Sequence, residues 1–383
     1  MALLTLNAGS SSLKFAVFDD AGGTRRLSAE IEGVGVDGAQ ARLTLKDAAG
    51  ERTRAVEAGD HAAALSAAFD AVEGEAIAAV GHRIVHGGAE FDRPVVVDAE
   101  IEARIEALSP LAPLHQPHNL AALRAARKAW PDAVQVACFD TAFHRSHPFT
   151  ADAFALPRRY YEAGVRRYGF HGLSYDFLTQ RLTELEGRVP QRAVLAHLGS
   201  GASLCAVKDG VSCDTSMGFS ALDGLPMATR CGQIDPGVLL YLMAEEGLDA
   251  AALTRLLYKE SGLKGLSGTS GDMREVEAGA TAATRDAYAY FIARCQREIA
   301  ALCAPLEGLD ALVFSAGIGE RSPGVRAAIC QGLGWLGVKL DAEANAAVTH
   351  EAALISAPDS PVRVWMIPTD EERVIARAAA ALI

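Results

Sequence analysis

Paired cysteines are missing from this sequence. Its seven cysteines, at positions 138, 205, 213, 231, 295, 303 and 330, form no C-x-x-C motif. Their scattered spacing indicates neither a zinc site nor a disulfide framework, and it favours a reducing compartment. The sequence also lacks an uncharged run of bilayer-spanning length, and Asn7 with a Gly/Ser cluster interrupts any signal-peptide pattern at the N-terminus. We therefore expect a cytoplasmic protein.

Positive charge is scarce. The 36 Lys and Arg residues against 48 Asp and Glu give a formal net charge of -12. A nucleic acid or an anionic membrane needs clustered positive charge, so neither is an expected partner. A small anionic substrate remains possible if a few cations gather locally. The length of 383 residues, half of them hydrophobic, exceeds what one core usually serves and predicts two globular lobes.

The G-x-x-x-x-G-K-[ST] motif of a P-loop is absent. Two other segments each read as strand, small-residue turn and strand. Each turn presents backbone N–H groups and hydroxyls suited to an anion, and Lys14 adds a point charge beyond the first. Taken singly, each is as well explained by a plain hairpin turn, but their repetition suggests an internally duplicated architecture. The expected strands and turns are 2–7, 8–12 and 13–19, and 194–197, 198–203 and 204–208.

A third small-residue loop follows an apolar strand in "VFSAGIGERSP", where we expect a loop at Gly317 to Gly319 and a helix from Ser322 or Pro323. Three such loops at strand ends predict a nucleotide site. Elsewhere strand-like runs alternate with helical periodicity, which is typical of α/β layers. The further expected strands are 78–85, 134–139, 311–315 and 362–367, and the expected helices are 62–75, 99–108, 119–130, 175–185, 276–306 and 371–382.

Cations lie in Gly-rich segments. Arg83 stands near a strand end between His82 and His86, while Arg167 precedes His171 in "RRYGFHGLSY". Arg230 lies within the segment "DTSMGFSALDGLPMATRCGQIDPG". For each of these residues, a solvated arginine or a buried structural histidine is as good an explanation as a catalytic role.

Two carboxylates also follow apolar strands. Asp140 ends "VQVACF", and a carboxylate at a strand end often holds a metal near a ligand crevice. Spacing alone makes Glu371 an ordinary helix N-terminal acid, in the acidic first turn that follows the expected cap at Thr369 or Asp370.

Nine segments together resemble the acetate kinase family, that is, the acetate, propionate and butyrate kinases of the sugar kinase, actin and heat-shock ATPase superfamily. They run in family order over nearly the whole chain: "LTLNAGSSSLKF", "GHRIVHGG", "CFDTAFH", "RRYGFHGLSY", "AHLGSGAS", "DTSMGFSALDGLPMATRCGQIDPG", "LSGTSGDMREV", "SAGIGERSP" and "IPTDEE".

The resemblance implies a two-lobed, duplicated actin-like (ribonuclease H-like) α/β fold with a nucleotide cleft between the lobes. The N-terminal lobe would span 1–144, with helix 373–383 packing back on it. The C-terminal lobe, 145–372, would bind the nucleotide and form a homodimer. The implied reaction is reversible, direct in-line transfer of the ATP γ-phosphoryl group to acetate, giving acetyl phosphate and ADP, with Mg²⁺ as cofactor and Mn²⁺ as a substitute.

Site residues follow from the resemblance position by position. The implied magnesium-site residues are Asn7 and Glu371. The implied substrate-binding residues are Arg83, Val85, Leu114 and Phe170. Asp140 matches the catalytic aspartate of the family, and His171 and Arg230 match its transition-state stabilisers. Arg83, also a catalytic residue, matches the arginine that binds the substrate carboxylate and phosphoryl group. The residues implied to contact ATP are Ser10, Ser12, Lys14, His197, Leu198, Gly199, Ser200, Gly201, Asp272, Met273, Arg274, Gly317, Ile318, Gly319, Glu320 and Arg321.

Elementary chemistry agrees with these roles. A carboxylic acid with a pKa of about 4 to 5 is ionised at pH 7, so the acceptor needs no general base. Asp140 is then better suited to positioning magnesium or a cation. The reaction needs cancellation of charge repulsion and in-line alignment, which suits Arg83, Arg230, His171 and Mg²⁺.

Four positions depart from the pattern of the family. Ser200 and Gln116 replace the usual Asn, Asp370 replaces Asn, and Ala221 replaces a proline of the acyl pocket. The loss of proline volume favours some tolerance of a larger acid, whereas Val85 is typical of acetate enzymes. We therefore expect acetate as substrate, with propionate second. The alternatives are a propionate or other short-chain acyl kinase and, in a different class, a nucleotide-switched chaperone or filament protein.

Overall fold

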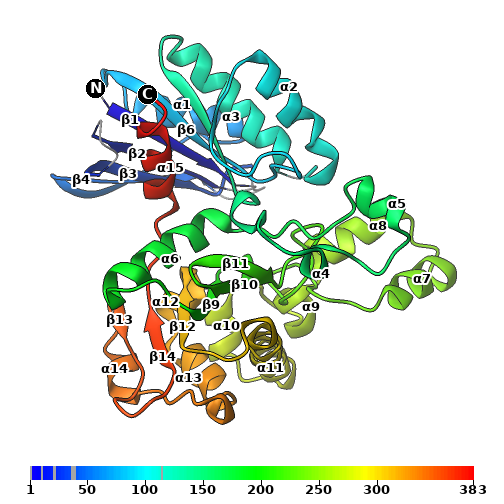
Figure 1. Ribbon diagram of the computed structural model, residues 1–383. Coiled ribbons are helices and arrows are strands. Elements are labelled where there is room, and N and C mark those ends of the chain that lie inside the picture. The colour runs from blue at the N-terminus through cyan, green and yellow to red at the C-terminus, as the bar shows by residue number, and fades with distance from the viewer. Residues whose placement is uncertain (1, 10–11, 20–22, 36–39, 114) are drawn as a thin grey trace. The chain divides into compact units, whose positions relative to one another are not determined.

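The computed structural model describes residues 2–9, 12–19, 23–35, 40–113 and 115–383. The chain divides into two compact units, Met1–Arg145 with Asp370–Ile383, and Ser146–Thr369. The C-terminal helix, α15 (Glu371–Ala380), therefore belongs to the same unit as the N-terminal strands (Figure 1). None of the described helices combines the length and apolar character that a bilayer-spanning helix requires.

The first unit is built on a mixed sheet. In its described residues the strand order is β5-β4-β3-β2-β1-β6-β8-β7. Strands β1, β6 and β8 are mutually parallel, and the other neighbours pair antiparallel. Besides α15, the elements are β1 (Ala2–Ala8), β2 (Ser12–Phe18), β3 (Arg25–Glu32), β4 (Arg42–Asp47), β5 (Gly50–Ala55), α1 (His61–Asp70), β6 (Ile77–Ile84), β7 (Val95–Val96), α2 (Ala99–Ala107), η1 (Ser109–Leu111), α3 (Gln116–Ala129), β8 (Val134–Phe139) and η2 (Ala142–His144).

Alternation along β1 assigns its side chains to two faces. Leu4 and Leu6 enter a hydrophobic core with Ala64 of α1 and Ala122 of α3. Helix α15 contacts β1, β6 and β8. At Gly81 of β6 the helix comes so close that a Cβ atom would lie 2.4 Å from Ile375 Cγ2, so only glycine permits this approach. The N-terminus of α15, which carries Glu371, is thereby fixed against the sheet.

The second unit repeats the pattern. Its described strands form a sheet of order β11-β10-β9-β12-β14-β13, in which β9, β12 and β14 are parallel. The order 3-2-1-6-8 of the first sheet thus matches 11-10-9-12-14 here, which fits the expected duplication. The strands are β9 (Arg192–Leu198), β10 (Ala202–Lys208), β11 (Val211–Thr215), β12 (Ala311–Ser315), β13 (Ala353–Leu354) and β14 (Arg363–Met366).

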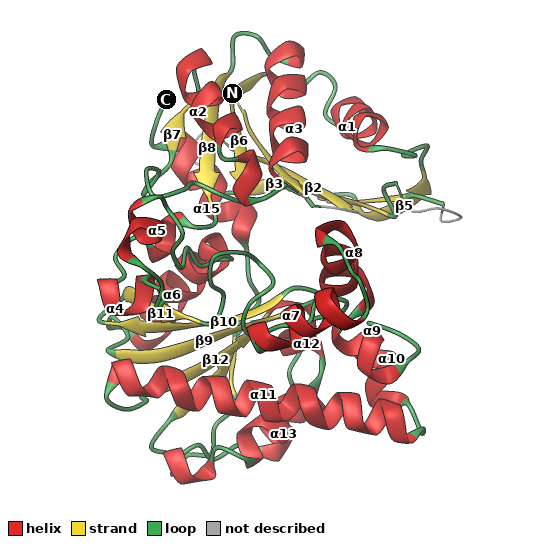
Figure 2. Ribbon diagram, turned by 90° about the vertical axis from the view of Figure 1, so that its right-hand side faces the viewer, coloured by secondary structure: helices red, strands yellow, loops and turns green. Residues whose placement is uncertain are grey.

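Helices cover this second sheet. Figure 2 shows the long helix α11 (Ala282–Leu306) running along it, and α11 buries Phe291, Cys295 and Ile299. The remaining helices are α4 (Phe149–Asp152), α5 (Arg158–Glu162), α6 (Gly172–Glu186), α7 (Pro236–Glu245), α8 (Ala250–Arg255), the π-helix η3 (Leu256–Glu260), α9 (Gly262–Ser267), α10 (Met273–Ala278), α12 (Ala316–Arg321), α13 (Pro323–Gln331), η4 (Gly334–Leu336) and α14 (Ala342–Ala346).

The prediction of an α/β fold is confirmed, and two local expectations are wrong. The single helix expected over 276–306 is two helices, because Gly279 interrupts the run and Thr281 caps the second helix by accepting a hydrogen bond from Thr284 N. The loop expected at 317–319 is helical: α12 spans Ala316–Arg321, and α13 begins at Pro323.

Candidate active site

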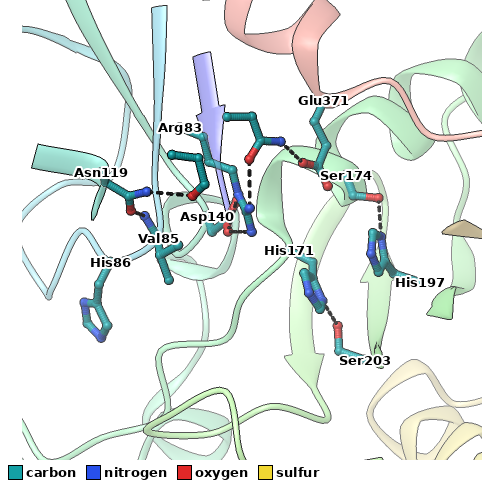
Figure 3. A network of polar contacts seen from close by, with 12 residues as sticks. Arg83, Val85, His86, Asn119, Asp140, His171, Ser174, His197, Ser203 and Glu371 are labelled. Atoms are coloured by element: carbon teal, nitrogen blue, oxygen red, sulfur yellow. Dashed lines mark hydrogen bonds and ion pairs between the residues drawn. The ribbon is translucent and has the colours of Figure 1, made fainter. Parts of the chain in front are cut away.

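Four of the predicted residues form a connected polar cluster in the first unit (Figure 3). Asn7 lies near the end of β1, Arg83 near the end of β6, and Asp140 directly after β8, so three neighbouring parallel strands bring them to one edge. Arg83 donates from Nε and Nη2 to Asp140 Oδ2, at 2.9 and 2.6 Å, and from Nη1 to Asn7 Oδ1 at 3.0 Å. Asn7 Nδ2 donates to Glu371 Oε2, also at 3.0 Å. We call this set the strand-end cluster.

Arg83 is the one cation of the strand-end cluster, and it faces the two carboxylates Asp140 and Glu371. Asp140 is 1% exposed, and burial raises its pKa to about 6 although the Arg83 charge and hydrogen bonds oppose the rise. Burial also acts to lower the pKa of Arg83, but Asp140 and Glu371 raise it overall, so the guanidinium stays charged. Asp140 thus holds Arg83 in a fixed orientation.

Oxygen atoms suited to magnesium are present in this cluster. The Asp140 Oδ1 atom is buried and has no hydrogen-bond partner among the described residues. Glu371 adds a second carboxylate and Asn7 an amide, which are hard oxygen donors. No group of three or more His, Cys, Asp or Glu side chains in the described ranges could hold a metal. The two carboxylates and the amide of the strand-end cluster fit Mg²⁺, which is usually bound by one or two carboxylates together with water and phosphate.

Two of the three residues expected to line the acyl pocket, Val85 and Phe170, lie within the described residues. Val85 is buried at 5% exposure, and its N–H donates to Asn119 Oδ1 at 3.0 Å, while Asn119 Nδ2 donates to the Ala8 carbonyl at 3.1 Å. Asn119 therefore ties Val85 to the end of β1. Phe170, in the second unit, is 3% exposed. Leu114, like the ATP-contact candidate Ser10, lies outside the described residues.

The first small-residue turn is closed by main-chain bonding. Gly9 N donates to the Ser12 carbonyl at 2.8 Å, and His61 Nε2 contacts the Gly9 carbonyl at 2.7 Å. Lys14 lies on β2 opposite Asn7 and pairs with Glu30 at 3.7 Å. Burial acts to lower the pKa of Lys14, but Glu30 and neighbouring carboxylates raise it overall. Lys14 therefore supplies a charged ammonium on the same strand pair as Asn7.

A second cluster lies in the second unit, around His171. This residue adopts a left-handed backbone conformation, with φ of 59°, immediately before α6. Its Nδ1 lies 2.7 Å from Ser203 Oγ, and its ring stacks on that of His197 at 4.2 Å between centroids (Figure 3). His197 Nδ1 in turn contacts Ser174 Oγ at 2.8 Å. A strained backbone held by packing and hydrogen bonds is common at functional sites.

Arg230 converges on the same place as His171. A Cβ atom built on Gly201 would lie 2.6 Å from Arg230 Nη2 and 3.4 Å from His171 Nε2. Both side chains therefore reach over the glycine backbone of the second hairpin turn. Arg230 Nη1 donates to the Ala221 carbonyl at 2.7 Å, which fixes the guanidinium. We call His171, Arg230 and Gly201 the glycine-turn cluster.

The third small-residue segment adjoins this turn. The Cβ position of Gly199 lies 3.6 Å from Ala316 Cβ and 3.9 Å from Gly317 N. Ala316, with φ of 62°, makes the sharp junction from β12 to α12. Glu320 Oε1 accepts from Ala316 N at 2.8 Å and from Thr369 N at 3.1 Å, so this carboxylate braces the main chain. Nothing lies within 4 Å of the Cβ position at Gly317, so the turn has an open surface there.

The other ATP-contact candidates present different groups. Arg274 pairs with Asp272, which caps α10 and whose pKa is lowered by that hydrogen bond. Met273 and Leu198 are buried, at 4% and 0% exposure. The remaining candidates Ser200 and Arg321 are exposed, and Ile318 is half-buried.

Some candidate cations have structural partners instead. Arg167 pairs with Asp223 at 2.9 Å in a separate cavity of about 220 Å³. His82 is buried against Gln135, and His86 Nδ1 accepts from Gly88 N. Gln116, one of the departures from the family pattern, is fully buried and donates to the His86 carbonyl.

Reasoning from the sequence missed the residues that hold the site in place. The sequence pattern places Asn119 only at the start of a helix, and Tyr175 and Ser203 only in a helix and a turn. Of these three, Ser203 alone gives a signal, as a polar side chain inside the apolar run "ASLCAV".

Comparison with known proteins finds close relatives over the whole length. Residues 2–377 match the Acetokinase family. The acetate kinase of Methylocella silvestris is 51% identical over 400 residues, covering 100% of this chain and 98% of that protein. Among solved structures, Porphyromonas gingivalis acetate kinase superposes with a TM-score of 0.89 at 36% identity, covering 100% of this chain and 99% of that one. A propionate kinase from Francisella tularensis gives 0.92 at 33% identity, with both chains fully covered.

Proposed function

The chain belongs to the acetokinase family, and we propose that it catalyses reversible transfer of the ATP γ-phosphoryl group to acetate, giving acetyl phosphate and ADP. The observation that carries the proposal is the strand-end cluster, in which Arg83, fixed by Asp140, adjoins the oxygen donors Asn7 and Glu371. A cation beside magnesium-type ligands is what transfer between a carboxylate and a polyphosphate requires.

The residues support direct in-line transfer. Acetate is already ionised at pH 7, so no side chain has to remove a proton from it. The barrier comes from repulsion between the anions and from the entropy cost of aligning them. Fixed positive groups lower both contributions. Asp140, whose Oδ2 is used by Arg83, acts as an orienting group in this scheme rather than as a base.

The strand-end cluster and the glycine-turn cluster have different roles in the proposed reaction. We propose that Arg83 binds the acid carboxylate and the transferring phosphoryl group. When bound, Mg²⁺, or Mn²⁺ in its place, would neutralise phosphate charge. Asn7 and Glu371 would hold that ion, and the buried Asp140 Oδ1 would accept a hydrogen bond from its water. His171 and Arg230 would donate hydrogen bonds to the oxygens of the transferring group.

The proposed nucleotide contacts come from three segments. Ser12, Lys14 and the outlying Ser10 would bind phosphate from the first turn. His197 to Gly201 would do so from the second turn, beside the Gly317 to Arg321 segment. Asp272 to Arg274 completes the set, with Met273 contributing main chain. The close packing of Gly199 against Ala316 and the open surface at Gly317 support this assignment.

Acid selectivity is proposed to rest on Val85, Leu114 and Phe170, with Ala221 in place of the usual proline. The fold alone does not separate the acids, because an acetate kinase and a propionate kinase superpose almost equally well. One methylene in an apolar pocket is worth about 1 to 3 kcal/mol. We expect acetate to be preferred and propionate to be used more slowly.

We also propose that the protein is a homodimer that joins through α7. None of the ten residues of this helix is buried. Its large apolar side chains are between 41% and 68% exposed, namely Val238, Leu240, Tyr241 and Met243. An apolar surface helix of this kind indicates a protein partner. Leu240→Glu should convert the dimer to a monomer in light scattering after gel filtration, whereas the same change at the exposed Val189 should not. A wild-type monomer at micromolar concentration would contradict the proposal.

We propose a cytoplasmic location, which fits the use of ATP as phosphoryl donor.

The activity can be tested by trapping acyl phosphate with hydroxylamine. The protein is supplied with Mg-ATP and acetate, propionate or butyrate, each with and without EDTA. We expect magnesium-dependent hydroxamate, greatest with acetate. A preference for propionate would point to a propionate kinase instead. No product from any acid, from folded protein that binds ATP, would contradict the proposal and favour a nucleotide-switched binding protein.

A further inference from the structure

A short hydrogen-bonded chain leads away from His171 into the core of the second unit. The Nδ1 atom of His171 lies 2.7 Å from Ser203 Oγ, and Ser203 Oγ is hydrogen-bonded to the Tyr175 hydroxyl. Ser203 comes from β10, and Tyr175 lies four residues after His171, in the first turn of α6. Both Ser203 and Tyr175 are 0% exposed. The chain is therefore shielded from water.

The available hydrogens give this chain a direction. Ser203 has one hydroxyl hydrogen and two partners, His171 and Tyr175. Burial raises the pKa of Tyr175 well above its ordinary value, so the phenol keeps its proton. Either oxygen can donate in the Tyr175–Ser203 contact, but only if the phenol proton goes to Ser203 Oγ is the one Ser203 hydrogen left for His171 Nδ1. In that order Tyr175 donates to Ser203, and Ser203 donates to Nδ1 of His171.

The other ring nitrogen of His171 faces the glycine turn. Its Nε2 lies 3.4 Å from the Cβ position of Gly201, where Arg230 Nη2 also approaches. If Nδ1 accepts the Ser203 hydrogen, the proton of the neutral ring is on Nε2. His171 then presents an N–H beside the Arg230 guanidinium, and both are hydrogen-bond donors.

We propose that Tyr175 and Ser203 are positioning residues that hold His171 in the Nε2–H tautomer, with its N–H directed at the transferring phosphoryl group. The inference rests on the proposed function for the identity of that group. The left-handed backbone of His171 supports it, because a strained residue needs such anchoring to keep one orientation. The wrong tautomer would place a lone pair against phosphate oxygen and repel it.

The first test is Tyr175→Phe, which removes one oxygen from a buried ring. We expect kcat to fall by about 10- to 100-fold, the size typical of losing an outer-shell partner that orients a metal-bound histidine, while KM for ATP and acetate changes less than about twofold. The matched control is Tyr168→Phe. Tyr168 is 2% exposed and donates to the Gly164 carbonyl, away from this chain, so its variant should keep wild-type kcat.

The second readout does not depend on turnover. Nitrogen-15 NMR of histidine-labelled protein reports which ring nitrogen carries the proton, and the His171 signal is assigned by its loss in His171→Gln. We expect Nε2–H in the wild type and a mixture of tautomers in Tyr175→Phe. An Nδ1–H tautomer in the wild type would overturn the inference even if the protein makes acyl phosphate. The Nε2–H result would stand even if it makes none.

A double-mutant cycle separates a relay from two independent packing effects. Ser203→Ala should lower kcat as much as Tyr175→Phe, and the pair together should lower it no further. Losses that multiply would contradict a single chain, as would unchanged kcat in both single variants. Should Tyr175→Phe fail to fold, Ser203→Ala gives the same NMR and kinetic test with a smaller change.

Discussion

Gly201→Ala is a sharp probe of the glycine-turn cluster. Its new Cβ would lie 2.6 Å from Arg230 Nη2, so the guanidinium must retreat by roughly 0.9 Å to reach van der Waals contact. His171 Nε2, at 3.4 Å, can stay in place. A misplacement of about 1 Å in a catalytic group can cost about 10²-fold in rate. We therefore expect kcat to fall about 100-fold.

The fold should not be affected by this change. Gly201 is absent from the described glycines with positive φ, so alanine fits its backbone. The clash is with the end of a side chain rather than with backbone, and Gly→Ala at a compatible site often stabilises by about 0.4 to 1 kcal/mol. Urea denaturation should give a free energy of unfolding equal to or slightly above that of the wild type. Initial rates of hydroxamate formation measure kcat.

Two comparisons make the result decisive. Gly334→Ala is the control, because nothing lies within 4 Å of its Cβ position and its φ is also not positive. Arg230→Ala should itself lower kcat by about 10³-fold or more. In that background, Gly201→Ala should lower kcat by less than about a further threefold. A Gly201→Ala enzyme with wild-type kcat would refute the placement of Arg230 at the transferring group.

Three further changes test other parts of the site. Glu371→Gln removes a charge from the proposed magnesium ligands, so the free Mg²⁺ concentration for half-maximal rate should rise about tenfold; an unchanged Mg²⁺ titration would contradict the assignment. Ala221→Pro should lower the propionate-to-acetate ratio of kcat/KM by about tenfold, and a constant ratio would exclude Ala221 from the acyl pocket. Burial lowers the pKa of His82 from 6.5 to about 4, so the unfolded state binds more protons between these values and stability is lost as pH falls. Urea denaturation should show His82 costing roughly 2 kcal/mol between pH 7 and pH 5, and His82→Gln should flatten that dependence; a slope equal to that of the wild type would count against it.

The fold was predictable from the sequence where local patterns agree with the tertiary structure. Strands 134–139 and 311–315 are apolar runs bounded by turns, and the structure has them at those residues. The interruption at Gly279 was missed because helical periodicity resumes three residues later. The helix at Ala316–Arg321 was missed because two glycines argued against it. Glu320 stabilises this helix by accepting from Ala316 N, a contact that depends on the folded turn.

The site residues likewise fall into those that the sequence identifies and those that it does not. Residues with chemistry of their own, such as Arg83, Asp140 and Arg230, stand in distinctive motifs and could be named. What fixes them could not, because Asn119, Tyr175 and Ser203 act through contacts made far along the chain. The Asn119 bond to Ala8, for example, joins residues 111 positions apart.

The most direct test of the central claim is the initial rate of ATP formation from acetyl phosphate and Mg-ADP, measured by luciferase for the wild type and Arg230→Ala. The account predicts rapid, magnesium-dependent ATP formation by the wild type and a rate at least about 10³-fold lower in the folded variant. No ATP from the folded wild-type protein, or equal rates from both, would contradict it.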